Sequence, residues 1–317
     1  LRARERAETN DSVRQAIRTG LAIADLDNEH AAIRLAAVEQ LEGSLNPEVH
    51  NRLTAIVAAG DAETDEKVRS AARAALSGIE SWRSFYGTIE TLFFGLSLGS
   101  VLVLAAIGLA ITFGVMGVIN MAHGELMMLG AYTTYVVQLL MPQYIGASVL
   151  LAIPLAFIVA GGVGVLIERG VVRFLYGRPL ETLLATFGVS LVLQQIVRDL
   201  FTANNRPVET PAWMAGSMQI NEALSITYNR LYVVVFMLIV FVILQLVLKR
   251  TSLGLRVRAV AQNRAMAKSM GVRTEWVDAL TFGLGSGIAG VAGVALSQLT
   301  NVGPNLGQAY IIDSFMV

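Results

Sequence analysis

Two long uncharged stretches constrain the fold more than any other feature of this sequence. No Asp, Glu, Lys or Arg occurs at residues 91–124 or 126–167, and Glu125 alone separates the two stretches. A helix needs about 20 consecutive apolar residues to cross a bilayer. The first stretch therefore predicts one membrane span. The second predicts two spans joined by a turn at "MPQYIG", residues 141–146.

Three further apolar segments, at residues 180–200, 231–248 and 277–300, have the length of membrane spans, and the tail after residue 305 could begin another. Only 15% of the residues are charged, against about 25% in soluble domains. We therefore expect an all-α, polytopic helical membrane protein with at least six spans and with part of its C-terminal region missing. The formal net charge is zero, which gives no reason to expect nucleic acid, and the absence of cysteine excludes disulfides.

The N-terminal part differs in charge from the rest of the chain. Residues 1–90 hold 11 Lys and Arg against 15 Asp and Glu, and this shift predicts a helical domain at 1–86 before a transmembrane domain at 87–317. The segments "IRLAAVEQLEG" and "VRSAARAALSG" match at an offset of 35 residues, with Gly43 and Gly78 where helix C-caps belong. This pattern resembles HEAT-like repeats, and an unrelated helical bundle is the alternative.

Lysines and arginines in the loops predict the orientation of the spans, because cytoplasmic loops carry an excess of them. The loop at residues 249–276 contains seven: Lys249, Arg250, Arg256, Arg258, Arg264, Lys268 and Arg273. We therefore expect this loop to be cytoplasmic. Counting the spans back from it places residues 1–86 outside the cytoplasm and residues 113–124 near the cytoplasmic end of the first helical hairpin.

Polar residues interrupt the apolar sequence at "INMAHGELMM", which contains Asn120, His123 and Glu125 within six residues. A polar side chain at membrane depth costs free energy unless it is paired or faces water. Three explanations are open: a broken helix that lines a cavity or solute pathway, a polar turn at the membrane interface, or polar contacts between helices. A metal site is not expected, because no other histidine lies in the membrane part to complete one.

The segment "NMAHGELMMLGAY", residues 120–132, resembles the first transmembrane signature of the ABC-type high-affinity branched-chain amino acid permease family. The resemblance covers about residues 88–317, and the matching positions are Asn120, Ala122, His123, Gly124, Glu125, Gly130, Ala131 and Tyr132. It implies that Asn120, His123, Gly124 and Glu125 line or shape the translocation pathway. The acidic N-terminal extension resembles that of urea permease subunits, which implies urea or a close small amide as cargo.

The basic loop carries a second resemblance. Its Ala265-Met266-Ala267-xxx-Gly271 is similar to the Glu-Ala-Ala-xxx-Gly loop of ABC importer permeases, with Ala265 in place of the glutamate. The resemblance implies a short cytoplasmic helix that docks on the ATPase subunit and includes Ala265, Ala267, Gly271 and Arg273. The alternative is that the cations of this loop only determine the orientation of the spans.

Together these features imply the permease subunit of an ABC importer, a multi-pass protein of the bacterial inner membrane whose N-terminal domain is extracytoplasmic. The implied partners are ATP-binding subunits, a second permease subunit, an extracytoplasmic substrate-binding protein and membrane lipid. The chain has no Gly-xxxx-Gly-Lys-[Ser/Thr] P-loop, so it cannot supply its own ATPase site. We expect it, as a permease subunit, to be no enzyme and to hold no cofactor. The alternatives are a branched-chain amino acid permease, a passive small-solute channel and a membrane enzyme that uses His123 and Glu125.

Overall fold

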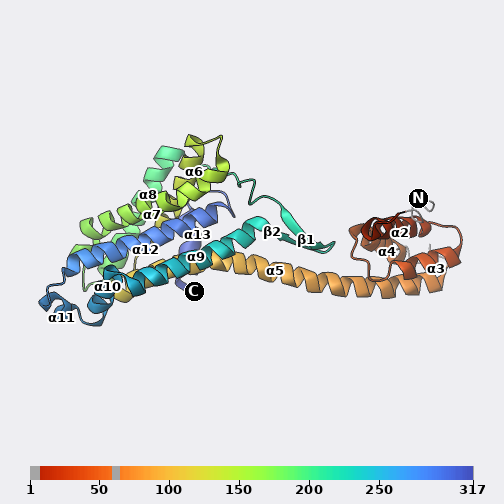
Figure 1. The fold of residues 1–317 in the computed structure, drawn as a ribbon, viewed down its shortest axis with the longest axis horizontal. Coiled ribbons are helices and arrows are strands. Elements are labelled where there is room, and N and C mark those ends of the chain that lie inside the picture. The colour runs from red at the N-terminus through yellow and green to blue at the C-terminus, as the bar shows by residue number, and fades with distance from the viewer. Residues whose placement is uncertain (1–7, 59–64, 317) are drawn as a thin grey trace. The chain divides into compact units, whose positions relative to one another are not determined.

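Helices form most of the computed structural model, which describes residues 8–58 and 65–316. The N-terminal helices are α2 (Asp11–Asp25), α3 (Ala31–Gln40) and α4 (Pro47–Ala58), followed by α5 (Glu66–Met116). Next come α6 (His123–Leu140), α7 (Ile145–Gly170), η2 (Val172–Phe174), α8 (Pro179–Phe201), β1 (Ser217–Asn221), β2 (Leu224–Thr227), α9 (Tyr228–Arg250), α10 (Ser252–Gln262), α11 (Arg264–Ser269), α12 (Thr274–Ser297) and α13 (Leu306–Met316) (Figure 1).

The predicted fold class is confirmed. In the described part of the chain five helical segments are long and apolar enough to cross a membrane: α5, α7 with η2, α8, α9 and α12. Helices α8, α9 and α12 lie within a few residues of the predicted spans. Helix α6 occupies the place of the predicted second span, but its 18 residues are not among the five. The β1–β2 hairpin lies in a loop for which the sequence predicted no strands.

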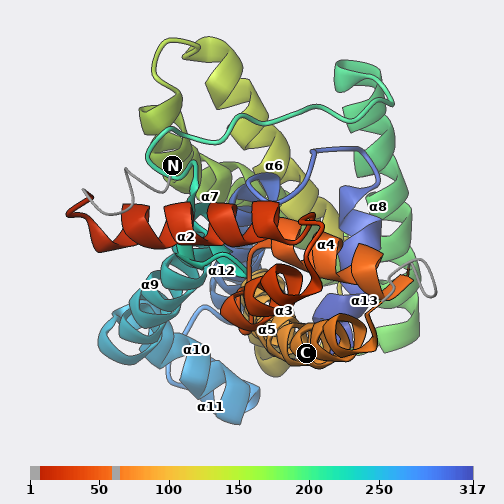
Figure 2. The same cartoon turned by 90° about the vertical axis from the view of Figure 1, so that its right-hand side faces the viewer.

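The chain divides into two compact units, Leu1–Phe93 with Ser217–Ile226 and Phe94–Gly216 with Thr227–Val317. In the first unit, helices α2, α3 and α4 pack with the first turns of α5 (Figure 2). Their core includes Val49, Leu53, Val68 and Ile79, each with no exposed surface. The domain boundary predicted near residue 86 falls inside α5, which runs without a break, and the boundary stays a prediction.

The two repeat-like segments lie on α3 and on the start of α5. Ala37 and Ala72, which match in the repeat, are both buried. Gly43 follows the end of α3 with φ of 76°, as a helix-terminating glycine does. The prediction was wrong for Gly78, which lies inside α5. One glycine costs a helix only about 1 kcal/mol, so the apolar sequence that follows continues the helix, and the HEAT-like assignment stays a prediction.

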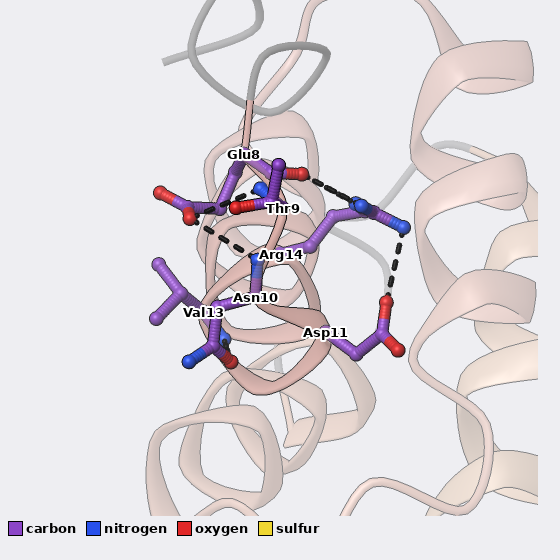
Figure 3. A network of polar contacts seen from close by, with 6 residues as sticks. All are labelled: Glu8, Thr9, Asn10, Asp11, Val13 and Arg14. Carbon is purple, nitrogen blue, oxygen red and sulfur yellow. Dashed lines mark hydrogen bonds and ion pairs between the residues drawn. The ribbon is translucent and has the colours of Figure 1, made fainter.

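A network of exposed polar contacts surrounds the start of α2 (Figure 3). The Asn10 side-chain oxygen accepts from the backbone N–H of Val13 at 3.5 Å, the arrangement of a helix N-cap. Arg14 donates to the carbonyl oxygen of Glu8 and pairs with Asp11 at 3.1 Å. These contacts satisfy the first turn of the helix and suggest no binding function.

Small residues bring α7 and α12 into close contact along most of their length. A Cβ atom at Gly161 would lie 3.0 Å from the carbonyl oxygen of Gly283, and one at Gly287 would lie 2.7 Å from the Phe157 ring. Gly290 in turn faces Ala160. Small residues let backbones approach closely where lipid gives little drive for association. The glycine-rich segment 283–293 therefore packs tightly against α7.

Candidate functional site

The sequence around residue 120 forms a break between two helices. Helix α5 ends at Met116, Gly117 adopts φ of 66°, and α6 begins at His123. Non-glycine residues rarely adopt such a positive φ, so Gly117 turns the chain away from the axis of α5. The predicted interruption of the helix is confirmed. Its cause is this glycine together with the Asn120 side chain, which accepts from the backbone N–H of Ala122 at 3.0 Å.

The break lies deep inside the second unit. The His123 Nε2 atom is 2.9 Å from the carbonyl oxygen of Ala105, eleven residues before the end of α5. At 1.5 Å per residue this is about 16 Å from that helix end. Because a carbonyl oxygen only accepts, the ring donates from Nε2. His123 therefore lies well back from the end of α5, since residues 117–122 lead the chain back into the interior before α6 starts, and its position relative to the cytoplasmic side stays a prediction.

All three polar residues are enclosed by protein. Asn120 and His123 have no exposed surface and Glu125 is 1% exposed. A turn exposed to water at the membrane interface would leave these side chains accessible, so their burial favours the other two explanations. None of the three faces solvent in this conformation, and the structure leaves their role in a solute pathway as a prediction.

One face of α8 supplies polar partners to the break. Four residues at every fourth position are at most 3% exposed: Thr182, Thr186, Ser190 and Gln194. Residues four apart lie on the same side of a helix, so these four form a stripe, here called the polar stripe of α8. The Thr186 hydroxyl oxygen accepts from the backbone N–H of Met121 at 3.1 Å, inside the break.

The last two residues of the polar stripe of α8, Ser190 and Gln194, contact Glu125 of α6. The Oε1 atom of Glu125 accepts from the Ser190 hydroxyl at 3.1 Å and from the Gln194 amide at 2.8 Å. Polar contacts between helices, one of the three explanations for the polar residues at 120–125, are therefore present. The sequence signal that could have found Ser190 is the polar residue at every fourth position of this apolar span, from Thr182 to Gln194. The neighbouring Gln195 is exposed and bonds Asp199 instead.

Three buried polar atoms of the break have no hydrogen-bond partner: Asn120 Nδ2, His123 Nδ1 and Glu125 Oε2. Such atoms are uncommon in folded proteins and call for an explanation. Glu125 Oε2 lies against Gly307 of α13, where a Cβ atom would stand 2.7 Å away. Gly124 also meets the Gly307 backbone too closely for a side chain on either residue. The site thus combines unused donor and acceptor atoms with a contact between the starts of α6 and α13.

The predicted coupling loop forms α10 and α11, which extend beyond the end of α9. Asn263 caps α11 by accepting from the Met266 N–H at 2.9 Å, and Gly271 follows with φ of 83°. The short helix with a glycine break is therefore confirmed. Ala265, Gly271 and Arg273 are exposed, whereas Ala267 is only 6% exposed and faces inward.

Among residues 8–58 and 65–316, no group of three or more His, Cys, Asp or Glu side chains is placed to hold a metal ion. Within these ranges the His123 ring bonds a carbonyl oxygen of α5, and the Glu125 side chain accepts a hydrogen bond from α8.

Comparisons with known proteins agree with this architecture. A family model described as the permease component of branched-chain amino acid transport systems matches residues 91–317. The permease protein LivH of Salmonella typhimurium is 34% identical over 68% of this chain and 72% of its own length. LivH of Escherichia coli K12 is 32% identical over the same shares, and BraD of Pseudomonas aeruginosa is 30% identical over 73% of this chain and 78% of its own length. No solved structure matches. The chain therefore belongs to the family of branched-chain amino acid transport permease components.

Proposed function

We propose that this chain is the membrane-embedded permease subunit of an ATP-driven importer and that the break before α6 forms part of its solute pathway. The observation that carries the proposal is the enclosure of Asn120, His123 and Glu125, with the His123 ring about 16 Å from the end of α5. Broken helices that line a central site are a recurrent transporter device. An importer binds its solute by exposing such a site to one side of the membrane at a time.

The unused polar atoms of the break suit a small neutral amide. Glu125 Oε2 accepts hydrogen bonds and Asn120 Nδ2 donates them, and both lack a partner. Urea carries four N–H donors and a carbonyl acceptor, so it can satisfy both kinds of atom. The helical N-terminal part lies outside the matched residues 91–317 and resembles the extension of urea permease subunits. These two observations support urea as the cargo.

A branched-chain amino acid is the second candidate cargo, because the relatives named above are all called branched-chain amino acid permeases. A zwitterion presents a carboxylate, which a cation or the N–H groups at the start of a helix can bind. In the part of the chain that the structure describes, the buried carboxyl side chains are Glu125, Glu168 and Asp278, and no lysine or arginine is buried. The absence of a buried cation in these residues favours the neutral amide over the amino acid.

The two cargoes are separated by uptake of labelled urea and labelled leucine in cells that express the complete transporter. An ATPase-inactive variant of the partner subunit is the control. We expect cells with the active transporter to take up urea and cells with the ATPase-inactive variant to take up none. If leucine is taken up instead, and only with the active ATPase, the chain is still an importer subunit but its cargo is an amino acid. Urea entry that survives in the control would identify a passive channel and reject the importer.

The exposed loop between α9 and α12 supports docking to an ATPase subunit. Two methionines four positions apart project from it, Met266 at 61% exposure and Met270 at 78%. Exposed cations surround them, including Lys268 and Arg273. Methionine and arginine are enriched in protein interfaces. We therefore assign the contact with the ATPase subunit to Met266 and Met270, beside the Ala265 and Gly271 positions that the resemblance implied.

Replacing Met266 and Met270 together with serine is expected to weaken the association of the permease with its ATPase subunit by at least about tenfold, since interface anchors contribute about 2 kcal/mol or more each. Binding is measured by titrating the purified ATPase subunit onto the permease complex. Met218→Ser changes an exposed methionine of β1, outside the loop, and serves as the control. Equal affinity in the double variant and the control would exclude these methionines from the interface.

A further inference from the structure

A buried ion pair links the coupling loop to the membrane helices. Asp278 lies one turn into α12 and its side chain has no exposed surface. Arg264, the first residue of α11, approaches it with both terminal nitrogens. Nη1 donates to Oδ1 at 3.3 Å, and Nη2 donates to Oδ2. Two parallel bonds between a guanidinium and a carboxylate define an orientation as well as an attraction. The direction of α11 is thereby linked to that of α12.

The ion pair continues to α7 through an aromatic ring. The Arg264 guanidinium lies over the Tyr176 ring, 4.9 Å from its centre, and the Tyr176 hydroxyl donates to Glu168 Oε1 of α7 at 3.3 Å. Glu168 is 1% exposed. Burial raises the pKa of Tyr176, and the carboxylates of Asp278 and Glu168 raise it further. The phenol therefore stays protonated and keeps its bond to Glu168.

A second contact ties the same two helices together. Arg169 lies 3.7 Å from Glu168 and over the Trp276 ring of α12 at 4.5 Å. Glu168 and Asp278 are both enclosed by protein, although each lies within about one turn of the end of its helix. Two buried carboxylates thus lie where the coupling loop meets α7 and α12.

Stability alone explains this cluster poorly. Removing a carboxylate from water costs free energy that a buried ion pair often fails to recover, and apolar residues of similar volume commonly replace such pairs without loss. Their best-attested advantage is a defined geometry. A permease driven by an external ATPase needs such geometry where the moving loop meets the membrane helices, since a loose contact would lose the motion.

We propose that the Arg264–Asp278 pair, supported by Tyr176 and Glu168, is the joint through which movement of α11 reaches α12 and α7. Arg264 and Asp278 are positioning residues and contact no solute. This inference rests on the proposed function, because it needs an ATPase subunit acting on α11. The inference names the side chains through which a movement of α11 would reach the membrane helices.

The packing beyond the joint leads to the break. A Cβ atom at Gly108 of α5 would lie 2.5 Å from the Gly285 carbonyl oxygen of α12 and 3.1 Å from the His123 ring. Gly290 and Gly293 of α12 meet α6 backbone directly at Gly130 and Met127. Close-packed helices transmit displacements because they contain little free volume. A shift of α12 therefore moves α6, which carries Glu125.

The test uses the complete transporter in proteoliposomes and measures solute imported per ATP hydrolysed. Asp278→Asn is the first variant, because Arg264 is 42% exposed and water can solvate it when its partner loses charge. Arg264→Lys is the second, since a lysine keeps the charge but cannot form two parallel bonds. We expect both variants to retain the ATPase subunit and to import at least about fivefold less solute per ATP, the lower end of typical coupling energies.

Arg178→Gln is the matched control, because this exposed arginine pairs with Glu181 at the start of α8 rather than with the joint. The control variant should import as much solute per ATP hydrolysed as the unchanged transporter. Unchanged ratios in both Asp278→Asn and Arg264→Lys would overturn the proposal. Loss of assembly in both variants would overturn it too, by showing that the pair serves folding. An unchanged transporter that imports nothing with ATP would instead reject the proposed function.

Discussion

Replacing Gly130 with alanine is expected to lower the melting temperature of the purified protein by about 5–10 °C. The Cβ atom would overlap the carbonyl group of Gly290 in α12, and that obstacle is backbone rather than the end of a flexible side chain. Overpacking of this kind costs about 1–3 kcal/mol. Gly293 meets the Met127 backbone a turn away. The two helices therefore have little room to separate at Gly130 alone. Thermal unfolding in detergent measures the effect.

Gly162→Ala is the matched control for that substitution. Gly162 lies on α7, is exposed, and has no atom within 4 Å of the position its Cβ would take. Alanine there is expected to leave the melting temperature unchanged or to raise it, since alanine favours a helix over glycine by up to about 1 kcal/mol. If Gly130→Ala were as stable as Gly162→Ala, the close contact between α6 and α12 would be wrong.

The positions of the helices follow from local sequence, and this part of the fold was predictable. An apolar run bounded by charges specifies a span whatever it packs against, so α8, α9 and α12 lie near the predicted segments. The glycine that ends α11 was predictable for the same reason, because a left-handed residue after a helix is a local requirement. Helix α6 has the length of a span but is less apolar than the five, because its 18 residues include His123, Glu125 and Gln138.

The partners of the buried polar groups could not be predicted in this way. Glu168 and Asp278 both lie near the end of a span, where a carboxylate usually faces water. Whether it does depends on tertiary contacts, here Arg264 of α11 for Asp278 and Tyr176 for Glu168. Ser190 likewise has no sequence feature that pairs it with Glu125, 65 positions earlier. The polar stripe of α8 predicts an inward face, but only the structure identifies what that face meets.

Replacing Glu125 with glutamine is expected to lower solute uptake at least about tenfold while leaving thermal stability nearly unchanged. Glutamine keeps the volume and the oxygen that accepts from Ser190 and Gln194, so the contact with α8 survives. It replaces Oε2, the acceptor without a partner, by an amide donor. A hydrogen bond to a charged group contributes about 1.5–3 kcal/mol, and about 1.4 kcal/mol corresponds to tenfold in rate. Uptake by the complete transporter, normalised to the amount of assembled protein, measures the effect.

Two further variants separate transport from folding at this position. Glu125→Ala leaves the Ser190 hydroxyl and the Gln194 amide buried without an acceptor, so it should lower stability by about 1–3 kcal/mol as well as uptake. Glu181→Gln changes an exposed glutamate of α8 that pairs with Arg178 on the surface, and it should alter neither quantity. Full uptake by Glu125→Gln would limit this carboxylate to holding α6 against α8. A loss of uptake in Glu125→Gln without a loss of stability would place Oε2 among the atoms that contact the solute. An acceptor needed only for packing would already have a hydrogen-bond partner within the protein.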